Sequence, residues 1–259
     1  MHEHPSNIVI KWTSEWAQSQ SLKTSVFNEI ESTNTYAKSD QNPSTCPLVE
    51  PSEIQILKPT MAGPSVYLAQ TQSAGRGRGS NQWLSPKSGG FLSSWSFCLA
   101  KVPQPILAPL VGLALCEAAI ATWPHVAFNL KAPNDLYIGG QKVAGLLIEI
   151  IDQSPQIRVI IGLGFNVFGG PEEIATATGL QNHLPSKLSK DEWQAFLQEW
   201  SNRLQNSLKA GQMSRLTSDA AQRLLPIMNR HPNLKEPILR IDDFAQLHFA
   251  SHTVHWHEL

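Results

Sequence analysis

A short segment in which three glycines alternate with two arginines restricts most strongly what this chain can fold into. The segment is Gly75-Arg76-Gly77-Arg78-Gly79, and it follows an apolar run, residues 66–69, that we interpret as a β-strand. Glycine allows positive φ angles and close approach of the backbone to a ligand, and arginine offers a planar, charged fork to phosphate or carboxylate oxygens. The sequence therefore predicts an anion-binding loop directly after a strand.

The glycine spacing differs from that of two common nucleotide-binding loops. Position 80 is Ser, so G-x-G-x-x-G is not completed, and the chain has no G-x-x-x-x-G-K-[ST] segment. Two other interpretations stay open at this point, a flexible solvated loop and an arginine–glycine segment that binds RNA. The second is weakened because 20 basic and 21 acidic residues leave a net charge of −1, which provides no overall field for nucleic acid.

Length and composition indicate an intracellular globular protein. A chain of 259 residues that is 41% hydrophobic can bury a core in one or two domains. The N-terminus lacks the features of a signal peptide, and the most apolar stretch, residues 106–123, is interrupted by proline and glutamate and reads as a buried helix. Three widely spaced cysteines argue against a disulfide framework or a zinc site: Cys46, Cys98 and Cys116. We expect a cytoplasmic protein that does not bind membranes.

The hydrophobic pattern up to about residue 168 predicts an α+β domain. We expect strands at residues 24–30, 66–69, 91–99, 126–130, 136–138, 142–151 and 158–163, and helices at residues 33–38 and 106–122. Residues 39–52 read as a loop, and Gly139-Gly140 predicts a hairpin that pairs the strands on either side of it. Together these elements predict a mixed, largely antiparallel sheet flanked by helices.

The remainder of the chain is more helical. Ser189 and Glu192 form a capping-box pattern, and an apolar stripe follows at helical spacing up to a plausible C-cap at Gly211. We expect a second helix at residues 218–228 and short strands at 238–241, 247–250 and 253–256. Four histidines near the C-terminus lack the spacing of a structured metal site and are predicted to be surface residues: His248, His252, His255 and His257.

Three separated motifs carry a family resemblance. They are Glu31-Ser32-Thr33-Asn34, the segment from Gln72 to Trp83, and Lys131-x-Pro133-Asn134-Asp135 followed by Lys142-x-x-Gly145. In this order they resemble the biotin protein ligases, or biotin–[acetyl-CoA-carboxylase] ligases, whose class II synthetase-like fold is shared with lipoate ligases. The resemblance covers roughly residues 24–168 and implies a catalytic domain over residues 1–210, with a small region of uncertain fold at 211–259.

The resemblance implies a two-step reaction. Biotin and ATP form biotinyl-5′-AMP, and the biotinyl group then passes to a lysine of a biotin carboxyl carrier protein. Mg²⁺ would accompany the nucleotide, and a homodimer is one assembly open to such a protein. Fewer than 35 residues precede the first motif, so we expect the type without an N-terminal DNA-binding domain, and no DNA partner.

The same resemblance assigns residues to roles. Two anions, the biotin carboxylate and the α-phosphate, must come together, and fixed cations reduce the repulsion between them. The implied catalytic residues are Lys142, Arg76 and Arg78. The implied biotin-binding residues are Ser32, Thr33, Asn34, Gln72, Gly75, Arg76, Gly77, Arg78, Lys142, Gly145 and Leu147. The implied nucleotide-binding residues are Arg76, Arg78, Trp83, Asn134, Asp135 and Asn166, with no metal site built from side chains alone.

Two departures from the family pattern and two alternative functions accompany this interpretation. Ala132 stands where the family usually has tryptophan, so a wall near the adenylate is smaller or is filled from elsewhere, and the usual C-terminal β-barrel is not recognisable. A lipoate or octanoate ligase or transferase is the closest alternative. The polar set Ser32, Thr33, Asn34 and Gln72 argues against it, because an aliphatic chain does not need those groups. An RNA-binding module that uses residues 75–79 is the alternative from another class.

Overall fold

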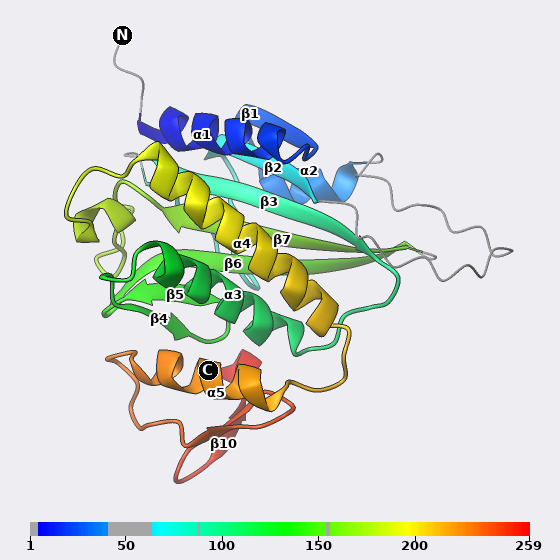
Figure 1. Cartoon of the computed structure of the whole chain (residues 1–259), viewed down its shortest axis with the longest axis vertical. Helices are drawn as coiled ribbons and strands as arrows, with labels where there is room; N and C mark the ends of the chain where they lie inside the picture. The colour runs from blue at the N-terminus through cyan, green and yellow to red at the C-terminus, as the bar shows by residue number, and fades with distance from the viewer. Residues whose placement is uncertain (1–4, 41–63, 87–88, 154–155) are drawn as a thin grey trace, which may run out of the picture.

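The computed structural model describes residues 5–40, 64–86, 89–153 and 156–259 (Figure 1). Seven strands form the main sheet: β1 (Thr24–Ile30), β2 (Ser65–Gln72), β3 (Gly90–Leu99), β4 (Phe128–Lys131), β5 (Asp135–Ile138), β6 (Gln141–Gln153) and β7 (Gln156–Asn166). Their order is β1-β2-β3-β7-β6-β5-β4, and only the β1–β2 pair among them is parallel. The predicted α+β class with a mixed, largely antiparallel sheet is confirmed.

Strand alternation gives the sheet two different faces. Three helices cover one face: α1 (Pro5–Ser19), α3 (Leu107–Thr122) and α4 (Lys190–Ala210). Phe91 and Trp95 of β3 point to this face. The ring centre of Phe91 lies 5.1 Å from that of Trp193, and the ring centre of Trp95 lies 6.3 Å from that of Trp200. Ser94 points to the opposite face, where it contacts α2 (Thr33–Ser39). Because successive strand residues point in opposite directions, one face forms the core and the other stays polar.

The predicted hairpin is present and fixes the position of Lys142. Gly139 has φ +54°, a value that glycine adopts without strain, and Ile138 pairs with Gln141 across the turn. The register shifts by one residue between Leu136 and Tyr137, so Tyr137 pairs with Lys142 and Asp135 pairs with Gly145. The hairpin therefore brings Asp135 and Lys142 to the same end of the sheet.

Helix α1 is an element that the sequence analysis did not predict. The spacing of Val9, Thr13 and Trp16 is typical of one face of a helix, and all three are buried. The helix packs against α4, where Trp193 Nε1 donates to Thr13 Oγ1 at 2.9 Å. Helix α4 begins with the predicted capping box at Ser189, and Gly211 caps its end in a right-handed conformation.

The C-terminal region contains the predicted helix, α5 (Ser218–Asn229), and three strands that are shorter than predicted: β8 (Arg240–Ile241), β9 (Gln246–His248) and β10 (Thr253–His255). The strands form a small antiparallel sheet. Leu224, Leu247 and Trp256 nevertheless belong to the same continuous core as the residues of the main sheet. The division at residue 210 stays a prediction.

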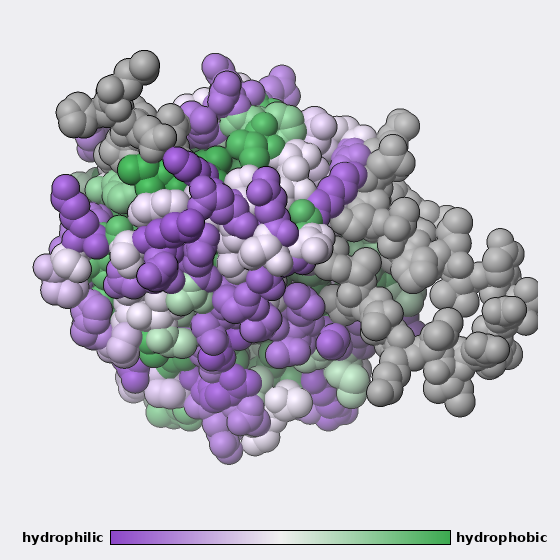
Figure 2. All heavy atoms as spheres, turned by 45° about the horizontal axis from the view of Figure 1, so that its top comes forward, coloured by the Kyte–Doolittle hydropathy of each residue, from purple (hydrophilic) through white to green (hydrophobic). Residues whose placement is uncertain are grey.

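Polar residues cover most of the face seen in Figure 2, and apolar residues show there in small groups. None of the helices in the described part of the chain combines the length and the apolar character that crossing a membrane requires. Ser39 ends α2, and the rest of the predicted loop, residues 41–52, lies outside the described residues together with Cys46.

Candidate active site

The first motif forms the N-terminus of α2, immediately after β1. Ser32 is the N-cap, and its hydroxyl accepts a hydrogen bond from the Thr35 amide. Thr33 donates to Gln72 Oε1 from its amide at 2.7 Å and from its hydroxyl at 3.1 Å. Since Ser32, Thr33 and Asn34 are each 3% exposed, these polar groups are held in fixed positions at the wall of a cleft.

Two residues that the sequence analysis missed support this wall from behind its lining residues, through hydrogen bonds to Thr33 and Asn34. The Ser94 hydroxyl lies 2.7 Å from Thr33 Oγ1 and also contacts Asn34 Oδ1. Asn34 Nδ2 donates to Glu149 Oε2 at 3.0 Å. Ser94 sits among other strand serines and Glu149 lies within the largely apolar strand β6, so neither belongs to a recognisable motif. Only the pairing of β3, β7 and β6 brings them to the motif residues.

Glycines hollow out the floor of the cleft. Gly145 of β6 pairs with Gly164 of β7, and both lie under the indole ring of Trp83. A Cβ atom at position 164 would come within 2.4 Å of that ring, and one at Gly162 would come within 2.5 Å of Asn34 Oδ1. These positions therefore need glycine, because real Cβ atoms do not make such short contacts.

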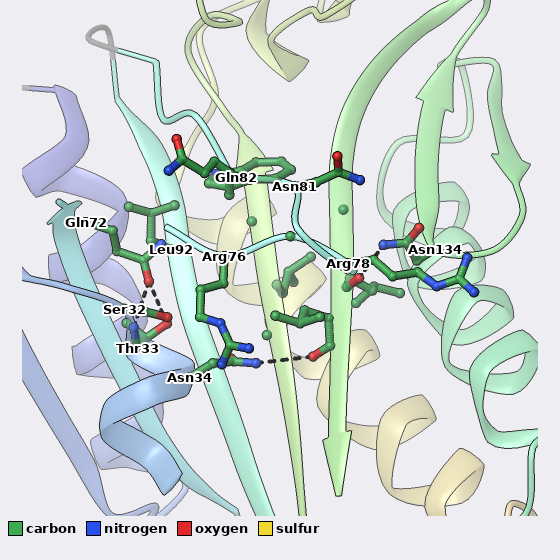
Figure 3. Close-up of a pocket in the computed structure, with 18 of the residues that line it drawn as sticks. Ser32, Thr33, Asn34, Gln72, Arg76, Arg78, Asn81, Gln82, Leu92 and Asn134 are labelled. Carbon is green, nitrogen blue, oxygen red and sulfur yellow. Dashed lines mark hydrogen bonds between the residues drawn. The ribbon is translucent and has the colours of Figure 1, made fainter. Parts of the chain in front are cut away.

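The Gly-Arg segment is the loop that leaves β2 and folds as a small hairpin over the cleft. Arg76 and Gln82 form an isolated antiparallel bridge, and the Gly77 amide donates to Asn81 O at 2.8 Å. Gly79, with φ +65°, forms the turn. The hairpin directs its two arginines to opposite ends of the cleft, Arg76 toward Asn34 and Arg78 toward Asn134 (Figure 3).

Two cations of the cleft are paired with carboxylates. Lys142 Nζ lies 2.7 Å from Asp135 Oδ1 and 5.4 Å from the centre of the Trp83 ring, and Arg76 Nη1 lies 3.0 Å from Glu149 Oε1. Burial alone would raise the pKa of Glu149, but hydrogen bonds from Lys38 and Asn34, with the charges of Lys38 and Arg76, outweigh it and lower that pKa below its ordinary value. Glu149 is therefore an anion at neutral pH.

The third motif is fixed to the strand that carries Lys142 and Gly145. Asn134 Nδ2 donates to Leu146 O at 2.6 Å, and the Leu146 amide donates to Asn134 O at 2.8 Å. These two bonds hold the turn between β4 and β5 against β6. As a result Asp135 and Lys142 face the same cleft as the loop and α2.

The structure brings most of the predicted site residues together around this cleft: Ser32, Thr33, Asn34, Gln72, Arg76, Gly77, Arg78, Trp83, Asn134, Asp135, Lys142, Gly145 and Leu147. Two others do not line it. Gly75 is the buried first residue of the loop, where a Cβ atom would come within 2.5 Å of Trp83 O, so glycine lets these two segments lie close together. Asn166 is buried at the end of β7, opposite Gly90.

The C-terminal segment reaches the end of the cleft marked by Asn134. Trp256 is buried beside the third motif, and its Nε1 donates to Pro133 O at 2.8 Å. His257 and Arg78 line a small cavity there, and burial, then the charge of Arg78, lowers the pKa of His257. An indole from the C-terminal segment thus contacts Pro133, the neighbour of Ala132 in the chain. Of the other histidines, His248 pairs with Asp242 at 2.9 Å.

Comparison with known proteins agrees with this arrangement. Residues 26–166 match the model of the biotin/lipoate A/B protein ligase family, which is more than half of the chain. This chain belongs to that family. The match contains all three motifs and ends at Asn166, the last residue of β7.

Two similar proteins are named as biotin ligases. The biotin–[acetyl-CoA-carboxylase] ligase of Paracoccus denitrificans is 34% identical over 131 residues, covering 48% of this chain and 52% of that protein. The corresponding Mycobacterium tuberculosis ligase is 32% identical over 152 residues, covering 53% and 55%. The chain thus matches about half the length of these relatives.

A solved structure shows the same fold over most of the chain. The biotin protein ligase of Aquifex aeolicus, in complex with biotin and ATP, superposes with a TM-score of 0.64 at 22% identity and covers 90% of this chain and 94% of that one. The similarity therefore extends beyond the matched motifs into the C-terminal region.

Proposed function

We propose that this family member is an ATP-dependent biotin protein ligase, which forms biotinyl-5′-AMP and transfers the biotinyl group to a lysine of a biotin carboxyl carrier protein. The observation that carries the proposal is the buried polar wall of the cleft, in which Thr33, Asn34 and Gln72 are already joined by hydrogen bonds, facing a set of cations. The names of the similar ligases in Paracoccus and Mycobacterium support the same substrate.

The polar wall suits the ureido ring of biotin better than an aliphatic chain. That ring has two N–H donors and one carbonyl acceptor, and the wall offers hydroxyl, amide and carbonyl groups from Ser32, Thr33 and Gln72. Lipoate or octanoate would cover these groups without hydrogen-bonding to their remaining donors and acceptors, at a cost of about 1–3 kcal/mol for each group so covered. The wall therefore favours biotin over lipoate, the other acid of the family.

In the first step, a carboxylate oxygen of biotin attacks the α-phosphorus of ATP, and the bond to the pyrophosphate oxygen breaks. The repulsion between the two anions opposes this step, and we expect Arg76 and Lys142, which line the cleft, to reduce it. In the second step, the amine of the carrier lysine attacks the acyl carbon and AMP leaves. We expect Arg78, at the other end of the cleft, to hold the phosphate until then.

Mg²⁺ fits this donor set as a companion of the nucleotide. Asp135 is the one carboxylate among the described residues that line the cleft, and Mg²⁺ commonly takes one or two protein carboxylates with phosphate oxygens and water. Asp135 would hold the ion, whose charge would further reduce the charge of the phosphates. Asp135 also orients Lys142, which lies 2.7 Å away.

Transfer of labelled biotin to a purified carrier domain tests the proposal. We expect label on a single carrier lysine when ATP and Mg²⁺ are present and none when ATP is omitted. Replacement of that lysine by arginine is the matched control on the carrier. Labelling that does not need ATP, or no labelling of any biotin carrier, would refute the assignment. Location in the cytoplasm and assembly as a homodimer stay predictions.

A further inference from the structure

Glu149 on β6 is a charged residue of the active-site face to which the reaction gives no role so far. Its carboxylate contacts three donors that come from two other parts of the site. Lys38 Nζ lies at 2.5 Å and Asn34 Nδ2 at 3.0 Å, both from α2, and Arg76 Nη1 lies at 3.0 Å, from the Gly-Arg loop. Glu149 thus links the loop to α2 across the mouth of the cleft.

This contact places a carboxylate on the cation that the substrate needs. Arg76 is proposed to meet the biotin carboxylate, yet here its guanidinium is bound to the carboxylate of Glu149 and extends down from the loop toward Asn34 (Figure 3). A guanidinium that forms a close pair with one carboxylate has fewer donors for a second. Biotin must therefore compete with Glu149 for Arg76.

The three contacts of Glu149 differ in how easily they break. The Arg76 side chain is 41% exposed, so its pair with Glu149 is weak and solvent can replace it. Glu149 itself is 15% exposed and keeps Lys38 and Asn34 when Arg76 leaves. Departure of Arg76 therefore does not leave Glu149 as a buried carboxylate without a partner. An unpaired buried carboxylate would make the exchange costly.

We propose, resting on biotin as the ligand, that Glu149 is a positioning residue that holds Arg76 as an internal substitute for the biotin carboxylate and releases it when that carboxylate arrives. Binding of the acid then exchanges one ion pair for another. Glu149 keeps the loop across the cleft before biotin binds, and the competition lowers the affinity for biotin by the strength of the Arg76–Glu149 pair.

Isothermal titration with biotin and with biotinol, the alcohol that lacks the carboxylate, tests this exchange. Glu149→Gln removes the charge but keeps an oxygen that can accept from Asn34. We expect it to lower the Kd for biotin about two- to five-fold, the range set by partly exposed ion pairs. The Kd for biotinol should stay the same, because the alcohol does not recruit Arg76.

Lys38→Met is a matched variant with the opposite expected sign. Lys38 contacts the same carboxylate but does not line the cleft. Its loss leaves Glu149 with Arg76 as its only cation among these contacts, so the pair strengthens and the Kd for biotin should rise about two- to five-fold. In an Arg76→Met background, neither Glu149→Gln nor Lys38→Met should change the Kd for biotin.

The outcomes separate the exchange from a purely structural role. The inference would be overturned if Glu149→Gln weakened biotin and biotinol binding equally. It would also be overturned if Glu149→Gln changed the Kd for biotin as much with Met at position 76 as with Arg76. Either result would show that Glu149 only supports Asn34. A Glu149→Gln protein that does not fold leaves the Lys38→Met pair of titrations to decide by its sign. If the wild type binds biotin and biotinol but the variants do not change the two Kd values as expected, only the inference is contradicted. If a folded wild type binds neither ligand, the assigned function is contradicted as well.

Discussion

The two ends of the cleft are built in different ways. At the α2 end, Ser32, Thr33 and Asn34 are almost fully buried, and Thr33 is bonded to Gln72 and, through Ser94, to Asn34. At the other end, Arg78 is exposed and faces an open cavity that is also lined by Asn134. Lys142 stands between them, paired with Asp135.

This difference matches the chemistry proposed for each end. A neutral ring is distinguished by hydrogen bonds that are fixed in advance, because a wrong ligand leaves buried groups without partners. A phosphate is held by exposed cations, which can rearrange around it. Changes at the α2 end should therefore alter affinity for biotin, and changes at the Asn134 end should alter retention of the nucleotide.

The largest effect is expected between the two ends, at Lys142. Lys142→Met removes a cation of the cleft that is proposed to meet both reaction partners, and loss of one such electrostatic group costs about 10²- to 10³-fold in rate. Biotin-dependent exchange of pyrophosphate into ATP measures this step. Thermal melting of the variant controls for folding, and an unchanged exchange rate would remove Lys142 from the mechanism.

At the Asn134 end, Arg78→Gly should shorten retention of the adenylate about 10- to 100-fold, because a charge-assisted hydrogen bond contributes roughly 1.5–3 kcal/mol. Formation of the adenylate should slow less. Free biotinyl-5′-AMP should then escape and label unrelated lysines. Dissociation of the adenylate from wild type, Arg78→Lys and Arg78→Gly gives the comparison. Equal rates for all three would leave Arg78 as an ordinary surface charge.

At the α2 end, Gly162→Ala should raise the KM for biotin about 3- to 30-fold and leave the KM for ATP unchanged. The new methyl group would stand 2.5 Å from Asn34 Oδ1, so it would displace that side chain and disrupt one or two of its hydrogen bonds. Gly112→Ala is the control, since its Cβ would meet nothing closer than 3.8 Å. Equal rises in both KM values would contradict the separation of the two ends.

The smallest effect on the reaction is expected for Ala132→Trp. Ala132 is 2% exposed and adjoins Pro133, whose carbonyl accepts from the Trp256 indole, so the new ring should clash and destabilise the fold by about 1–3 kcal/mol. Thermal melting measures this change. Combining Ala132→Trp with Trp256→Ala should restore part of the stability if the two indoles compete for one space, and no recovery would show that they do not.

Local signals in the sequence predicted most of the fold. The alternation in β3, the capping box at Ser189 and the Gly139-Gly140 turn depend on neighbours within a few residues, and all three are present. The strand ends were less accurate. Strand β4 begins at Phe128 rather than Val126, because the pairing partner, β5, is short and ends at Ile138.

The site was predictable where its residues lie in motifs and not where the sheet brings them together. The turn at Asn134 and the loop at Arg76 were found from their sequences, but Ser94, Glu149 and Trp256 come from elements that carry no motif. Their roles follow from strand order and from contacts over long sequence separations, which periodicity cannot supply. The assignments of Gly75 and Asn166 to ligand contact rested on resemblance alone, and neither lines the cleft.

The central claim is that the polar end of the cleft selects biotin for activation by ATP. Pyrophosphate exchange with biotin, lipoic acid or octanoic acid as the only added acid tests it directly, because it needs no carrier protein. The account predicts exchange with biotin and at least about 100-fold less with either aliphatic acid, since two or more buried polar groups would be covered without a hydrogen bond to the ligand. Exchange with lipoic or octanoic acid at a rate equal to or above that with biotin would contradict it.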